Sequence, residues 1–199
     1  MNAPVLVVDL EATCSEDMST WDMEIIELGC CWVAQEGIVL DRFQSFVRPA
    51  VNARLTEFCS SLTGIQQADV DSAPPFPVAA EMLRQFVERH QGPGSNWASW
   101  GAYDRRQLER DSVRHGIAEP IALPHVNLKQ SFAKQQRIGK QVGVTRALTL
   151  TNLAFEGNHH RALDDALNIA RLLPWALGKR LLRARERAEG ATPETLAGR

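Results

Sequence analysis

The sequence lacks the features that define several classes of protein. No apolar run approaches the ~20 residues that a transmembrane helix needs, and the first four residues lack the basic start and apolar stretch of a secretory signal. The four cysteines, Cys14, Cys30, Cys31 and Cys59, form no C-x-x-C pair and have no zinc-ligand spacing with histidine. We therefore expect a cytoplasmic protein with reduced thiols and no contact with a membrane.

An excess of positive charge is also missing. The chain has 22 Lys and Arg against 24 Asp and Glu, which gives a net charge of -2. Proteins that coat long duplexes usually carry a strong positive excess, so we expect any contact with nucleic acid to be local, such as a cleft that holds one strand end. The length of 199 residues suits one domain. We expect it to span residues 1–187, followed by a polar, frayed tail over residues 188–199.

The order of the predicted elements indicates an α/β fold. Three strands come first and are followed by alternating helices and strands, which implies a mixed sheet with helices packed on it. The strand order cannot be derived from this pattern. The polar, basic segment 129–143 is expected to be partly mobile. Apolar periodicity predicts strands at 5–10, 24–33, 39–47, 97–100 and 126–128, and helices at 55–62, 78–90, 103–115, 148–155 and from 163 onward, with an interruption near Pro174.

Two carboxylates stand at the end of the first apolar run. Asp9 and Glu11 are two residues apart, so their side chains share one face of a strand. Buried side by side, they would repel each other unless a cation neutralised them. The alternative is that the strand has ended and that both acids lie in solvent, and this segment alone does not separate the two.

Two further acidic segments stand at predicted helix starts. Asp104 opens the helix after strand 97–100, and capping that helix is the simpler interpretation of its role. The third segment places His160 five residues before Asp165 and four before Asp164. An imidazole titrates near working pH and suits general-base catalysis, and an adjacent Asp can bind a metal. The alternative is a surface histidine beside a capping aspartate.

Taken together, these segments supply four carboxylates and one histidine from three distant regions. Such a set fits two hard divalent cations, best matched by Mg²⁺ or Mn²⁺. Two ions ~3.5–4 Å apart stabilise the attacking and leaving oxygens in known phosphodiester-cleaving sites.

The same three segments resemble the motifs of the histidine subclass (DEDDh) of the DEDD exonuclease superfamily. They read Asp9-Leu10-Glu11-Ala12-Thr13, Trp100-Gly101-Ala102-Tyr103-Asp104 and His160 to Asp165. The resemblance covers roughly residues 4–177. It is greatest to the branch of histone-mRNA and small-RNA 3′-exonucleases, in the segments Phe46-Val47-Arg48-Pro49, Leu55-Thr56-Glu57-Phe58-Cys59, Leu62-Thr63-Gly64-Ile65 and Val70-Asp71-Ser72-Ala73-Pro74-Pro75-Phe76.

The resemblance implies a ribonuclease-H-like fold with a five-stranded mixed sheet. It implies hydrolysis of RNA or DNA from a free 3′ end, with release of nucleoside 5′-monophosphates. The family spacing selects Asp165 over Asp164 and His160 over His159. The implied metal ligands are Asp9, Glu11, Asp104 and Asp165, with His160 as general base.

Contacts with substrate are less specified. The resemblance implies that the chain near Ala12 and Thr13 meets the terminal nucleotide. Tyr103 is a candidate for stacking on a base, whereas we expect Trp97 and Phe58 to pack in the core. The basic stretch that includes Lys129, Lys134, Arg137, Lys140 and Arg146 is a candidate for phosphate contacts, although a solvated surface is the commoner role of such a run.

Two other functions compete with the exonuclease. A non-catalytic nucleic-acid-binding module on a nuclease fold would be indicated by loss of one of the five site residues, and none is lost. A proofreading subunit that docks on a polymerase would be indicated by a hydrophobic tail or partner motif, and the residues after Ala188 are polar.

Overall fold

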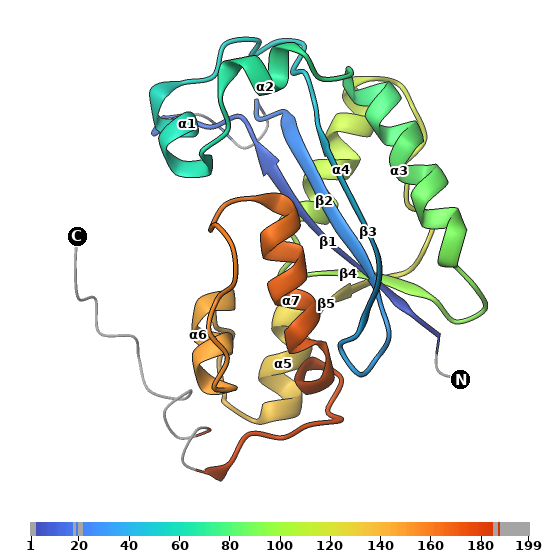
Figure 1. The fold of residues 1–199 in the computed structure, drawn as a ribbon, viewed down its shortest axis with the longest axis vertical. Coiled ribbons are helices and arrows are strands. Elements are labelled where there is room, and N and C mark those ends of the chain that lie inside the picture. Colours follow the sequence, from blue (N-terminus) through green and yellow to red (C-terminus); the bar gives the residue numbers. More distant parts are fainter. Residues whose placement is uncertain (1–2, 18, 20–21, 185–186, 188–199) are drawn as a thin grey trace.

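The computed structural model describes residues 3–17, 19, 22–184 and 187. Its five strands form one mixed sheet in the order β3-β2-β1-β4-β5 (Figure 1). β2 runs antiparallel to β1 and β3, whereas β4 and β5 run parallel to β1. The predicted five-stranded mixed sheet is confirmed. The strands are β1 (Val5–Ala12), β2 (Ile25–Val33), β3 (Val39–Phe46), β4 (Asn96–Ser99) and β5 (His125–Asn127).

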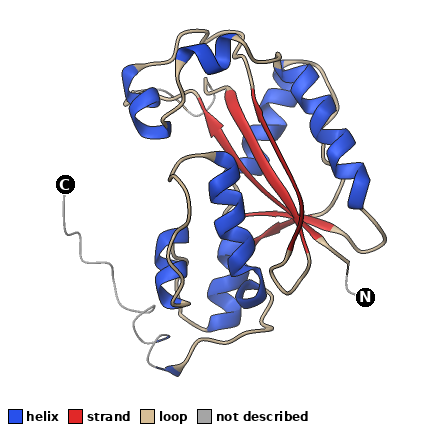
Figure 2. Cartoon of the chain, viewed as in Figure 1, coloured by secondary structure: helices blue, strands red, loops and turns tan. Residues whose placement is uncertain are grey.

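Helices cover both faces of the sheet (Figure 2). One face packs against α3 and α4, and the other packs against α5, α6 and α7. The short helices α1 and α2 lie beside the C-terminal end of β1 (Figure 1). The bounds are α1 (Glu57–Thr63), α2 (Gln67–Asp71), α3 (Phe76–His90), α4 (Tyr103–Arg114), α5 (Leu128–Gln136), α6 (Val144–Leu150) and α7 (Ala162–Ala176).

Strand alternation divides the core into two layers. Cys30 belongs to the layer under α3 and α4, and Cys31 to the layer under α5, α6 and α7, as expected for neighbours on one strand. Trp97 is buried, as predicted, whereas Phe58 is 43% exposed, so its predicted core position is wrong. None of the helices in the described ranges is both long and apolar enough to cross a membrane.

The structure differs from the predicted helices at four places. Segment 129–143, for which no helix was predicted, contains most of α5, because Leu128 and Phe132 are one turn apart and both are buried. Its partial mobility stays a prediction. The helix predicted at 148–155 lies earlier, as α6, and ends before Asn152, which has a positive φ of 58°. α2 was not predicted. α7 continues through Pro174 and ends two residues later. The predicted tail over 188–199 lies outside the described residues.

Candidate active site

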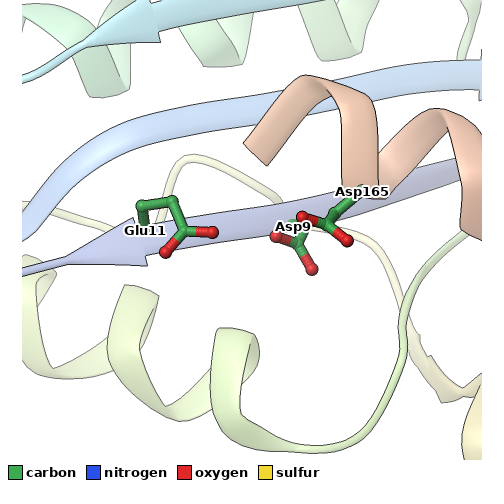
Figure 3. Close-up of side chains that lie close together, drawn as sticks. All are labelled: Asp9, Glu11 and Asp165. Atoms are coloured by element: carbon green, nitrogen blue, oxygen red, sulfur yellow. The ribbon is translucent and has the colours of Figure 1, made fainter. Parts of the chain in front are cut away.

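The C-terminal half of β1 carries two carboxylates on one face of the sheet. Asp9 and Glu11 both lie within β1, so the strand extends beyond its predicted end at Leu10. Both side chains point to the face that α7 covers, and each offers an oxygen within 4.8 Å of an Asp165 oxygen (Figure 3). The arrangement with both acids in solvent beyond the strand is therefore not the one observed.

Asp165 reaches these residues because the start of α7 approaches β2 very closely. A Cβ atom built on Gly29 of β2 would lie 2.1 Å from the carbonyl carbon of Ala162. The buried carboxylate of Glu27 also accepts hydrogen bonds from the N–H of Ala162 at 3.1 Å and from Nε of Arg161 at 3.2 Å. β2 therefore fixes the position from which α7 presents Asp165.

This close approach predicts a large effect for Gly29→Ala. The added methyl group must displace α7, so we expect the free energy of unfolding to fall by about 3 kcal/mol, at the upper end of overpacking costs. Gly92→Ala is the matched control, because no atom beyond the adjacent residues lies within 4 Å of a Cβ there, and we expect a change within about 0.5 kcal/mol. Chemical denaturation measures both. Equal stabilities for the two variants would contradict the constraint at Gly29.

The two adjacent aspartates of α7 have different partners. Asp164 accepts a hydrogen bond from the N–H of Asn158 at 2.8 Å and packs against Gly157, where a Cβ would lie 2.6 Å from its carboxylate. It orders the loop that precedes the helix. Asp165 instead faces β1, and its carboxylate is hydrogen-bonded to the backbone N–H of His160. The structure thus places Asp165, and not Asp164, with the other acids.

His160 lies exposed in the loop directly before α7. Its φ of 59° is in the left-handed region, which residues other than glycine rarely adopt. Burial raises the pKa of Asp165. The positive charges that His160 and His159 carry when protonated partly offset this increase, with His160 contributing more than His159. The ring of His159 stacks on Phe155 with the centroids 3.6 Å apart. Both histidines are therefore near the acidic residues, but His159 has a packing partner.

Asp104 approaches the other acids from the first turn of α4. It is only 6% exposed, and its Oδ1 accepts a hydrogen bond from the N–H of Leu10 in β1 at 3.2 Å. Burial raises the pKa of Asp104 to about 6, although hydrogen bonds from its own N–H, Ser99 and Leu10 oppose this increase. Asp104 thus ties α4 to β1. The capping role suggested for it is wrong, because Ala102 is the N-cap of α4 and Asp104 is the second residue within the helix.

The electrostatics of these acids favour a bound cation. Burial raises the pKa of Asp9 well above its ordinary value, and the charges of Asp104 and Asp165 raise it further. Burial raises the pKa of Glu11 to about 8, and the negative charges of Asp165 and Glu27 make smaller contributions in the same direction. Converging carboxylate oxygens are ligands that hard divalent cations prefer, so the residues present fit a divalent metal site.

Burial and, to a smaller extent, mutual repulsion of these carboxylates predict how metal and pH affect stability. The folded protein keeps a proton on Glu11 up to about pH 8, whereas the unfolded chain releases it near pH 4.5. In chelator we therefore expect the melting temperature to fall as pH rises from 5 to 8. Mg²⁺ or Mn²⁺ should reduce this fall, because it binds the ionised carboxylates. Calorimetry on the wild type and on Glu11→Gln tests this, because the melting temperature of the variant should depend less on pH. Identical melting curves of the wild type with and without metal at pH 8 would refute the expectation.

The predicted substrate contacts differ in accessibility. Ala12 and Thr13 are buried, and the Thr13 hydroxyl accepts a hydrogen bond from the N–H of Glu24 at 2.9 Å. Tyr103 is 40% exposed, and its hydroxyl lies 3.5 Å from the sulfur of Met23. The contacts of all three residues with a nucleotide stay predictions.

Sequence reasoning missed the residues that support the site from β2. Glu27 is fully buried and forms an ion pair with Arg161 at 3.2 Å. Gln44 also donates a hydrogen bond to Glu27. The available signal was a glutamate in the middle of an apolar strand, since buried charges are almost always paired.

A five-stranded mixed sheet with an acidic group on its central strand matches the ribonuclease-H-like fold of solved DEDDh nucleases. The chain belongs to the Exonuclease (RNase T) family, whose model matches residues 6–173. It is similar to the solved nuclease domain of 3′hExo bound to rAMP, a DEDDh family member, with a TM-score of 0.76 and 26% identity over 86% of this chain and 90% of that one. A 3′-exonuclease structure that concerns 3′-end-specific recognition of the histone mRNA stem-loop gives a TM-score of 0.77 and 27% identity, over 86% of this chain and 80% of that one.

Curated relatives show the same relationship. The 3′-5′ exonuclease eri1 of Schizosaccharomyces pombe is 32% identical, over 85% of this chain and 66% of that protein. The human 3′-5′ exoribonuclease 1 is 28% identical, over 84% of this chain and 50% of that protein. The chain thus spans half to two thirds of the length of these relatives.

Proposed function

We propose that the chain is a metal-dependent 3′→5′ exonuclease that releases nucleoside 5′-monophosphates from single-stranded or short RNA or DNA. The observation that carries the proposal is the convergence of Asp9, Glu11 and Asp165 within 4.8 Å, with Asp104 beside them. The family and the names of the relatives support the same activity, and those names favour RNA.

The acidic residues would bind two divalent cations, Mg²⁺ or Mn²⁺. Such ions, when bound, acidify a water molecule and stabilise the attacking and leaving oxygens. Asp9 and Glu11 hold their positions through β1, while Glu27 and Arg161 hold the start of α7 and hence Asp165. His160, exposed at the edge of this group, would take the proton from the attacking water.

The substrate end and polarity can be tested directly. We expect the purified protein with Mn²⁺ to shorten a linear RNA oligonucleotide labelled at its 5′ end one nucleotide at a time and to release nucleoside 5′-monophosphates. A circular RNA of the same sequence should survive, because it has no 3′ end. Gel electrophoresis and chromatography of the products measure both. Equal rates on linear and circular substrates would reject the exonuclease, and binding without hydrolysis would favour a non-catalytic module.

A further inference from the structure

Charge is distributed very unevenly along the chain. Residues 120–184 contain ten Lys or Arg and three Asp or Glu, whereas residues 3–119 contain nine Lys or Arg and 18 Asp or Glu. All four lysines belong to the second segment. The net charge of -2 therefore combines an acidic part of the fold with a basic one.

The basic residues gather on α5 and α6, which pack beside α7, and on the chain between them. Helices α5 and α6 share a hydrophobic layer with α7 (Figure 1), and the sequence between Pro120 and Phe155 contains no acidic residue. Lys134 and Arg137 are exposed, and the other basic side chains of this stretch are half-buried. We call these residues the basic surface: Lys129, Lys134, Arg137, Lys140 and Arg146.

Part of the basic surface is hollowed. Residues Gln130, Lys134, Lys140 and Gln141 contribute to the lining of a depression of about 400 Å³ between α5 and the chain that follows it. Two ammonium groups and two amide groups supply hydrogen-bond donors, and the part of the chain that the structure describes contributes no carboxylate to this lining. A phosphate group is the ligand that such a set of donors suits.

The acidic residues of the candidate active site lie between this surface and a surface of opposite charge. On the other side of the start of α7 are α1 and α2 (Figure 1), and residues 57–71 contain Glu57, Asp69 and Asp71 but no Lys or Arg. A polyanion whose 3′ end is bound at Asp165 would be repelled over α1 and α2 and attracted over α5 and α6.

We infer that the basic surface binds the sugar-phosphate backbone of the substrate strand upstream of the 3′ end that is being cleaved. This inference rests on the proposed function and adds the direction in which the strand leaves the site. The contact is made with phosphates and carries no sequence preference. It would make longer strands better substrates than dinucleotides.

The test compares substrate lengths in the double variant Lys134→Glu/Lys140→Glu. We expect KM for a 20-nucleotide RNA to rise about tenfold or more, whereas kcat/KM for a dinucleotide should stay within about twofold. The slope of log KM against log salt concentration should become shallower by about 0.7 for each phosphate that the variant no longer binds. The milder Lys134→Gln/Lys140→Gln should show the same changes to a smaller extent, and thermal melting checks that both variants fold.

Arg84→Glu/Arg89→Glu is the matched control. It makes the same change of charge on α3, where both side chains are more than half exposed, and it should leave both substrates unaffected. Anisotropy of a labelled 20-nucleotide RNA in chelator measures binding without hydrolysis, so a failure of this inference can be told from a failure of the proposed activity. Equal effects of the Lys134/Lys140 reversal on both substrates, or no effect on the long one, would overturn the inference.

Discussion

Replacement of Asp9 by asparagine is expected to lower the rate of hydrolysis by roughly 10³-fold or more, because the metal ions contribute several kcal/mol to transition-state stabilisation. Asp9 lies on β1 with a carboxylate oxygen within 4.8 Å of oxygens of Glu11 and Asp165, and the charge of Asp104 also acts on it. Asparagine keeps the size of the side chain but removes the charge that a divalent cation would bind.

The same change should make the metal-free protein more stable. The charges of Asp104 and Asp165 add to burial in raising the pKa of Asp9, so its ionised form is unfavourable in the folded protein without metal. We expect Asp9→Asn to melt higher than wild type in chelator at pH 8 and to lose the stabilisation by Mg²⁺. Asp41→Asn is the control, since Asp41 pairs with Arg89 on the surface, and it should retain full activity. Wild-type turnover in Asp9→Asn would refute the metal assignment.

Replacement of His160 by asparagine should lower turnover by about 10²–10⁴-fold, the usual contribution of a positioned general base. Asparagine is the sharper choice because it tolerates the positive φ of this position, so the backbone N–H can still bind the Asp165 carboxylate. The stabilisation by Mg²⁺ should therefore be unchanged. Single-turnover rates and calorimetry separate the loss of a base from the loss of metal.

The matched control for His160 is its neighbour. His159→Asn removes a ring that stacks on Phe155, and we expect less than about a tenfold loss of turnover, since His159 takes no proton in the proposed mechanism. If His159→Asn were the more damaging change, the assignment of the base to His160 would be wrong.

The sequence alone determined the parts of the site that depend on local geometry. The two-residue spacing of Asp9 and Glu11 requires a shared face once the segment is a strand, and the strand extends far enough to include both. The apolar periodicity also predicted most helices. It failed for segment 129–143, because polar and basic residues on the outer side of α5 obscure the buried positions Leu128 and Phe132.

Only the tertiary structure decided which residues meet. No rule of local geometry separates Asp164 from Asp165. The choice follows from the close approach of α7 to Gly29 and from the Glu27–Arg161 ion pair. Both contacts join positions more than 130 residues apart in the sequence. The strand order, which places β1 between β2 and β4, likewise cannot be predicted from the periodicity of apolar residues. Periodicity reports which face of an element is buried, whereas the partner of that face is selected by packing between distant segments.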